Sequence, residues 1–152
     1  MLNGRAYQSA RNMLISFQSR LSRLHSLYEL LLEREASAGC GGQNYGGGRP
    51  STGTHSDPVA CRYARLETLR NVISRAEKLI LPACCVRNEV KNSGREDERE
   101  MFLILERHFI AGESIKAVSG ALGKSLRTMH RRKNELIERT AERIIMYQER
   151  AC

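Results

Sequence analysis

Hydrophobic residues in the first part of the chain recur at alternating intervals of three and four. Two interleaved series with a seven-residue spacing produce this pattern: Leu14, Leu21 and Tyr28, and Phe17, Leu24 and Leu31. Positions with this spacing lie on one side of an α-helix and are typical of a coiled-coil seam. The pattern predicts one amphipathic helix over about residues 6–36.

A second stripe with the same spacing lies further along the chain. Its members are Leu66, Ile73 and Ile80, interleaved with Leu69 and Ala76. Ser56 or Asp57 can cap the start of this helix, and Pro58 suits its first turn. Pro82 is expected to end the helix, because proline lacks the backbone N–H that a helix interior needs.

A glycine-rich segment at residues 38–55 separates the two predicted helices. It lacks the GxxxxGK[ST] motif and no apolar strand precedes it, so we interpret it as a linker rather than a phosphate-binding loop. Neither helix can bury its apolar stripe alone. Residues 1–82 are therefore expected to form a two-helix, coiled-coil-like arm, paired either as an antiparallel hairpin within one chain or between subunits.

Residues 83–94 are expected to form a connector, with a short helix that turns Val86 and Val90 inward. The apolar spacing then becomes helical again. We expect residues 95–152 to form a separate C-terminal domain.

The first helix of this domain is predicted over about residues 95–110. Its first turn contains Glu96, Asp97 and Glu98, whose charges complement the positive end of the helix dipole. Gly112 is expected to end the helix in a left-handed conformation.

The next segment has the pattern of two helices joined by a tight turn. Ser114 can cap the first helix and Ser125 the second, and Gly123 lies in the turn between them. The apolar side of the first helix consists of Ile115, Val118 and Leu122, and Ser119 is the small residue where the two helices cross. Gly123 can adopt the positive φ that such a turn requires. Leu126 and Met129 are expected to pack back against the first helix. This order predicts a helix-turn-helix.

The helix after Gly123 is strongly cationic. From Lys124 to Lys133 the chain carries five positive side chains, one histidine and no acid. If Leu126 and Met129 face inward, helical geometry turns the opposite side outward. That outer face carries Arg127, His130, Arg131 and Asn134.

These residues are candidate contacts to double-stranded DNA. A recognition helix inserts its N-terminal part into the major groove, where Arg127 and Arg131 can make bidentate contacts to guanine and Asn134 is less suited to reach a base. The other candidates are Lys124, Ser125, Thr128 and Lys133, which are better placed for phosphates, and His130. The alternative is an ordinary solvated helix face. The position of the run directly after a cap and a glycine turn favours DNA contact.

Overall composition agrees with a polyanionic partner. The formal net charge is +8, which favours a nucleic acid before a membrane surface. The chain contains no Trp, three Phe and five Tyr, too few for the stacked aromatic platforms of single-strand binding. No apolar run approaches the length of a membrane span, so no membrane partner is expected.

The sequence offers no constellation typical of an enzyme. No Ser/His/Asp or Cys/His arrangement has a neighbouring orienting residue that the spacing supports. The five cysteines include no CxxC pair, which argues against a structural zinc site. We therefore expect no catalytic activity, no cofactor and no metal.

The stretch from about Phe102 to Arg143 resembles region four of bacterial sigma factors. The matching residues are the run His108–Ser114, then Ile115, Val118, Leu122, Gly123, Ser125, Thr128 and Met129. The whole chain is similar to phage late-gene transcriptional regulators of the ArpU and RinA type. This resemblance implies a promoter target, contact with RNA polymerase and a location in the bacterial host cytoplasm. Lys124 and Arg132 depart from the pattern, which usually has apolar residues there.

We therefore expect an all-α, sequence-specific DNA-binding regulator that forms a homodimer through its N-terminal helices. One alternative is a small terminase subunit that recognises phage DNA for packaging, although such proteins usually carry the DNA-binding module first. Another is a helical adaptor that does not bind DNA and docks its positive face on an acidic partner.

Overall fold

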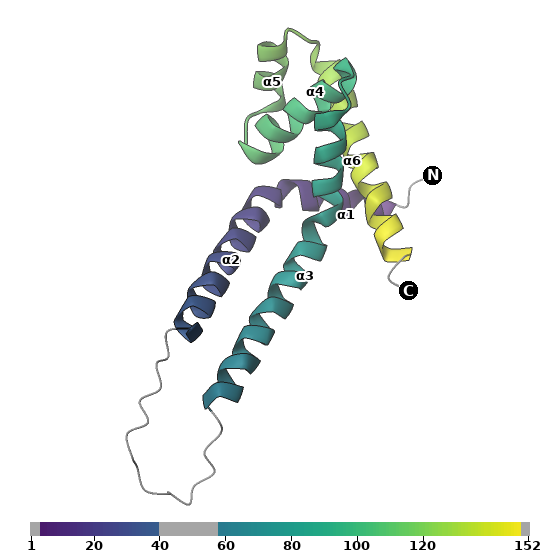
Figure 1. Cartoon of the computed structure of the whole chain (residues 1–152). Helices are drawn as coiled ribbons and strands as arrows, with labels where there is room; N and C mark the ends of the chain where they lie inside the picture. Colours follow the sequence, from purple (N-terminus) through teal and green to yellow (C-terminus); the bar gives the residue numbers. More distant parts are fainter. Residues whose placement is uncertain (1–3, 40–57, 150–152) are drawn as a thin grey trace, which may run out of the picture. The chain divides into compact units, whose positions relative to one another are not determined.

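The computed structural model describes residues 4–39 and 58–149, and every regular element in these ranges is helical (Figure 1). The elements are α1 (Gly4–Ile15), α2 (Phe17–Gly39), α3 (Pro58–Asn92), α4 (Glu96–Ile104), the π-helical segment η1 (Leu105–Ile110), α5 (Ile115–Leu122) and α6 (Leu126–Glu149). The all-α prediction is confirmed for this part of the chain. None of the described helices is long and apolar enough to cross a membrane.

Two expectations from the sequence concern residues outside these ranges. The predicted glycine-rich loop lies outside the described residues except for its first two positions, which belong to α2. Ser56 and Asp57, the expected caps of the second helix, also lie outside them.

The chain forms two compact units. The main unit comprises the described parts of Met1–Leu21 and Lys78–Cys152, and the hairpin unit those of Ser22–Glu77. This division cuts the chain at other points than the expected segments 1–82, 83–94 and 95–152. It does so because α1 packs along α6, so that the first helix is part of the main unit.

The predicted helix over residues 6–36 is interrupted at Ser16, and the expectation of one continuous helix is wrong there. The Ser16 hydroxyl donates a hydrogen bond to the carbonyl oxygen of Asn12 at 2.8 Å. A serine side chain that bonds back to the preceding turn competes with the backbone and bends a helix. The seven-residue spacing on either side is unaffected, which is why the periodicity alone does not reveal the turn.

Helix α3 runs through Pro82 to Asn92, so the expectation that Pro82 ends this helix is also wrong. Proline costs a helix interior about 3 kcal/mol. The ten residues beyond it compensate by burying Ala83, Val86 and Val90, since each fully buried valine contributes about 1.5–3 kcal/mol. The prediction that Val86 and Val90 face inward is confirmed.

The core of the main unit forms where α1 and α6 meet the end of α3, α4, η1 and α5. Its largest fully buried side chains include Leu14, Phe17, Val86, Met101, Ile104, Leu105, Val118, Met129, Leu136 and Ile137. The distal half of α6 is further held to α3 by an ion pair between Arg143 and Glu89 and by a 3.3 Å contact between the Tyr147 hydroxyl and Cys85 Sγ. Leu14 and Phe17, which begin the predicted seam, therefore lie in the core of the main unit.

The hairpin unit consists of the later part of α2 and the earlier part of α3, which run antiparallel side by side (Figure 1). Leu66, Leu69 and Ile73 are buried. Polar contacts tie the two helices as well: Arg70 Nη2 lies 2.7 Å from Glu35 Oε1, and the Tyr28 hydroxyl donates a hydrogen bond to Glu77. Apolar side chains remain exposed on this unit, including Tyr28, Leu32, Val59, Tyr63 and Val72.

Substitutions in α1 test whether this helix belongs to the core of the main unit. Leu14→Ala should lower the free energy of unfolding by about 2–5 kcal/mol, because it leaves a cavity in place of a buried side chain. Ile15 is 59% exposed, and Ile15→Ala should change stability by less than about 0.5 kcal/mol. Urea unfolding of both variants measures the difference. Equal effects would contradict the packing of α1 described above.

Candidate nucleic-acid interface

The start of α6 is set by a tight turn after α5. The Ser114 hydroxyl accepts a hydrogen bond from the Ala117 backbone N–H at 3.2 Å, which caps α5 as predicted. Gly123 adopts a left-handed conformation with φ of 62° and ψ of 25°, also as predicted. Ser119 is buried and its hydroxyl donates to the Lys124 carbonyl oxygen at 2.7 Å. Its role thus includes a hydrogen bond across the turn, beyond the small size that the sequence suggested.

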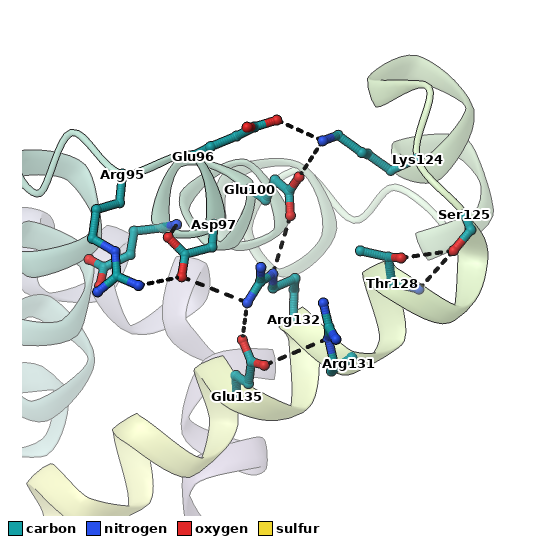
Figure 2. Close-up of polar contacts among 11 residues, drawn as sticks. Arg95, Glu96, Asp97, Glu100, Lys124, Ser125, Thr128, Arg131, Arg132 and Glu135 are labelled. Carbon is teal, nitrogen blue, oxygen red and sulfur yellow. Dashed lines mark hydrogen bonds and ion pairs between the residues drawn. The ribbon is translucent and has the colours of Figure 1, made fainter.

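The first turn of α6 is capped by side chains from the candidate set. Ser125 Oγ accepts a hydrogen bond from the Thr128 backbone N–H at 3.1 Å, and the two hydroxyl oxygens lie 2.8 Å apart (Figure 2). The prediction that Ser125 caps this helix is confirmed. A capped first turn holds the backbone of α6 rigid at the end that carries most of the cationic side chains.

The side of α6 that faces inward differs from the prediction at one position. Met129 is fully buried as expected, but Leu126 is 43% exposed. Leu126 is the first residue of α6 and lies at the edge of the core. The inward position expected for it is therefore wrong.

Four candidate residues lie exposed on α6: Arg127, His130, Arg131 and Asn134. The Arg131 side chain is 64% exposed, and its Nε lies 3.8 Å from Glu135 Oε1. Such a surface pair contributes about 0–1 kcal/mol. Arg127 forms no ion pair with a carboxylate of the described residues. Both guanidinium groups are therefore open to an external anion.

Lys124 and Arg132 face α4, where acidic side chains bind them (Figure 2). Lys124 Nζ lies 2.7 Å from a Glu96 oxygen and 2.9 Å from a Glu100 oxygen. Arg132 Nε lies 3.2 Å from the other Glu100 oxygen. Glu100, whose side chain is only 9% exposed, thus accepts from Lys124 of the turn before α6 and from Arg132 of α6.

Two further carboxylates extend this ion network. Arg132 Nη1 lies 2.8 Å from Glu135 within α6 and 3.8 Å from Asp97 of α4. The network lets Arg132 lie in a largely buried position, since its side chain is 18% exposed and paired with carboxylates. The sequence suggested helix-dipole compensation for the acids of α4. Their pairing with Lys124 and Arg132 was not predicted, although the four-residue spacing of Glu96 and Glu100 places both on one helix face.

The ion network shifts protonation equilibria. The hydrogen bond and the positive charge of Lys124 lower the pKa of Glu96, and the same contacts raise the pKa of Lys124. A hydrogen bond from Ser93, with Arg139 as a further partner, lowers the pKa of Glu98. Lys124 therefore stays charged while its ammonium group is occupied by the protein's own carboxylates.

Asn134 and Lys133 lie beside α1. Asn134 Oδ1 accepts a hydrogen bond from the Tyr7 hydroxyl at 3.3 Å. Lys133 is half-buried and lines a cavity of about 420 Å³ together with Arg11 of α1 and His108 of η1. These contacts make both residues part of the packing between α6 and α1, and they leave Asn134 less available to an external ligand than the arginines.

The cationic part of the α6 surface ends where Glu135 and Glu138 begin to line it. A shallow cavity of about 670 Å³ along α6 is lined by Arg127, Thr128, Arg131, Asn134, Glu135 and Glu138. The two glutamates occupy its C-terminal side. An anionic ligand is therefore favoured over the first two and a half turns of α6 and disfavoured beyond them.

No protein-family model, characterised protein or solved structure matches this chain. The function of the site is therefore inferred from its own geometry and charge.

Substitution of Gly123 tests whether the turn needs its left-handed conformation. A Cβ at Gly123 would meet nothing within 4 Å, so Gly123→Ala should lose about 1–2 kcal/mol of stability from backbone strain alone. Gly120 is helical and its Cβ position is equally open, so Gly120→Ala should gain about 0.5–1 kcal/mol. Chemical unfolding should show that the free energy of unfolding falls in Gly123→Ala and rises in Gly120→Ala. A stabilising Gly123→Ala would contradict the role of the turn.

The lowered pKa values predict loss of stability in acid. A carboxyl group whose pKa is lower in the folded state binds more protons when unfolded, so its contribution is present above its usual pKa of 4.5 and is lost as pH falls through the folded value. The urea midpoint should fall less between neutral pH and pH about 3 in a Glu96→Gln, Glu98→Gln variant than in wild type. Glu142→Gln, at an exposed position of α6, should follow the wild-type profile. Parallel profiles for all three proteins would refute the assignment.

Proposed function

We propose that this protein is a sequence-specific, double-stranded DNA-binding transcriptional regulator. In this proposal α5, the turn at Gly123 and α6 act as a helix-turn-helix, and the first half of α6 enters the major groove. The observation that carries the proposal is the pair Arg127 and Arg131, exposed on a helix whose start is held by a left-handed glycine and a serine cap. The net charge of +8 agrees with it.

The candidate residues take different roles in this proposal. Arg127 and Arg131 read guanine through bidentate hydrogen bonds. Ser125, Thr128 and His130 contact phosphates or the edge of the groove, whereas Lys133 packs between α6 and α1. Lys124 is a positioning residue, because its ammonium group is held by Glu96 and Glu100. Asn134 likewise positions α6 against Tyr7.

The ion network supports DNA recognition indirectly. With Lys124 and Arg132 paired to α4, the rotation of α6 about its axis is set, and the two reading arginines face outward. The carboxylates on the inner side also neutralise cations that would otherwise bind phosphates without regard to sequence. Affinity then depends on fewer phosphate contacts and should still fall with increasing salt.

In this proposal the protein acts as a homodimer at a promoter. A single module of this size binds DNA weakly, so we propose a homodimer formed through the N-terminal helices, and the exposed apolar residues of the hairpin unit, such as Leu32 and Val72, favour it. Two copies would read half-sites about one helical turn apart. The resemblance to phage late-gene regulators favours a promoter target and contact with RNA polymerase.

The reading residues can be tested on a duplex site selected from a random library. Arg127→Ala and Arg131→Ala should each weaken binding to that site by about 1–3 kcal/mol and relax the base preference at one position. Arg99→Ala, which removes an exposed positive charge from α4, should change affinity much less. Titration of each variant at several salt concentrations measures its affinity for the selected site and the salt dependence of that affinity.

Several results would contradict the proposal. If selection from the random library enriched no duplex sequence, the proposed sequence-specific binding would be wrong. Equal losses from Arg127→Ala, Arg131→Ala and Arg99→Ala would show that only net charge matters. Unchanged affinity in both α6 variants would show that another face of the protein meets DNA.

A further inference from the structure

A second cationic site lies in the hairpin unit, apart from α6. A cavity of about 620 Å³ opens between α2 and α3 and is lined by Arg34, Ser37, Arg62, Arg65 and Leu66. Arg34 and Ser37 are three residues apart on α2, and Arg62 and Arg65 are three apart on α3. Each helix thus turns one face toward the same space. We refer to it as the arginine cavity.

The three arginines of this cavity are not neutralised by the described part of the protein. None of them forms an ion pair with a described carboxylate, and no acidic residue is among the described lining residues. Glu35, next to Arg34 in the sequence, pairs instead with Arg70 at 2.7 Å. Three like charges around one cavity repel one another. An anion in the cavity would remove that repulsion.

The chemistry of the lining narrows the class of anion. Guanidinium groups present planar pairs of N–H donors that match phosphate oxygens, and they stay charged at any physiological pH. The Ser37 hydroxyl donates a hydrogen bond to the Glu33 carbonyl oxygen at 2.8 Å. The donors for an anion in the cavity therefore come from the arginines. Leu66 is buried and forms an apolar wall. The volume lies within the usual range of ligand pockets and exceeds what a single phosphate group fills.

We propose that the arginine cavity binds clustered phosphate groups. This goes beyond the proposed recognition of DNA by α6, because the residues lie on other helices and in the other compact unit. The phosphates can come from a free polyphosphate-bearing molecule or from the backbone of a duplex. Both sources present adjacent anionic oxygens to the same three guanidinium groups.

The experiment uses the full chain and two matched double variants. Arg62→Gln with Arg65→Gln removes two charges from the cavity. Arg23→Gln with Arg75→Gln removes two exposed charges from the same unit without touching the cavity lining. Calorimetric titration with inorganic tripolyphosphate forms one arm, and titration with a short duplex of random sequence forms the other.

We expect the cavity variant to weaken binding by about tenfold or more in one arm, while the control variant stays within about twofold of wild type. Loss confined to tripolyphosphate identifies a free polyphosphate ligand, and loss confined to the duplex identifies the DNA backbone. Equal behaviour of the two double variants in both arms would overturn the proposal. Because Arg127 and Arg131 are intact in both variants, base preference at the selected site is unchanged, and failure here is distinguishable from failure of DNA recognition by α6.

Discussion

The pairing of Glu100 with Lys124 and Arg132 is the interaction on which the geometry of α6 depends. A largely buried carboxylate is costly unless charged donors satisfy both of its oxygens, and here one cation binds each oxygen. Removal of Lys124 or Arg132 would leave one Glu100 oxygen without its charged partner. Together with the burial of Met129, Leu136 and Ile137, the ion network favours one rotation of α6, and that rotation determines which arginines face solvent.

The same helix is supported from the opposite side by α1. Leu14 and Phe17 are fully buried in the main unit, and Tyr7 reaches Asn134 on α6. A residue near the start of the chain thus holds a residue 127 positions later. Because α1 packs along α6, a change in the N-terminal helix can alter the orientation of α6 without touching the cationic surface itself.

Arginines in this protein fall into two groups with different physical roles. Arg132 and Arg139 pair with carboxylates of α4 at 3.1–3.2 Å and hold α6 to it, and Arg107 pairs at 2.7 Å with Glu113 in the segment before α5. Those on the outer face of α6 and in the arginine cavity have weak partners or none among the described residues. The arginines of this second group present their positive charge to external anions. They occur in both compact units.

Local features of this protein are determined by the sequence alone. The caps at Ser114 and Ser125 and the left-handed Gly123 depend on neighbours within a few residues, and each follows from backbone sterics and helical spacing. Only the tertiary structure decided that α3 continues through Pro82, that α1 packs along α6, and that Lys124 and Arg132 face α4. These outcomes depend on partners between 24 and 127 residues away. Periodicity identifies which side of a helix is apolar, but it does not say which distant surface that side meets, or which charges are thereby paired and which are left free.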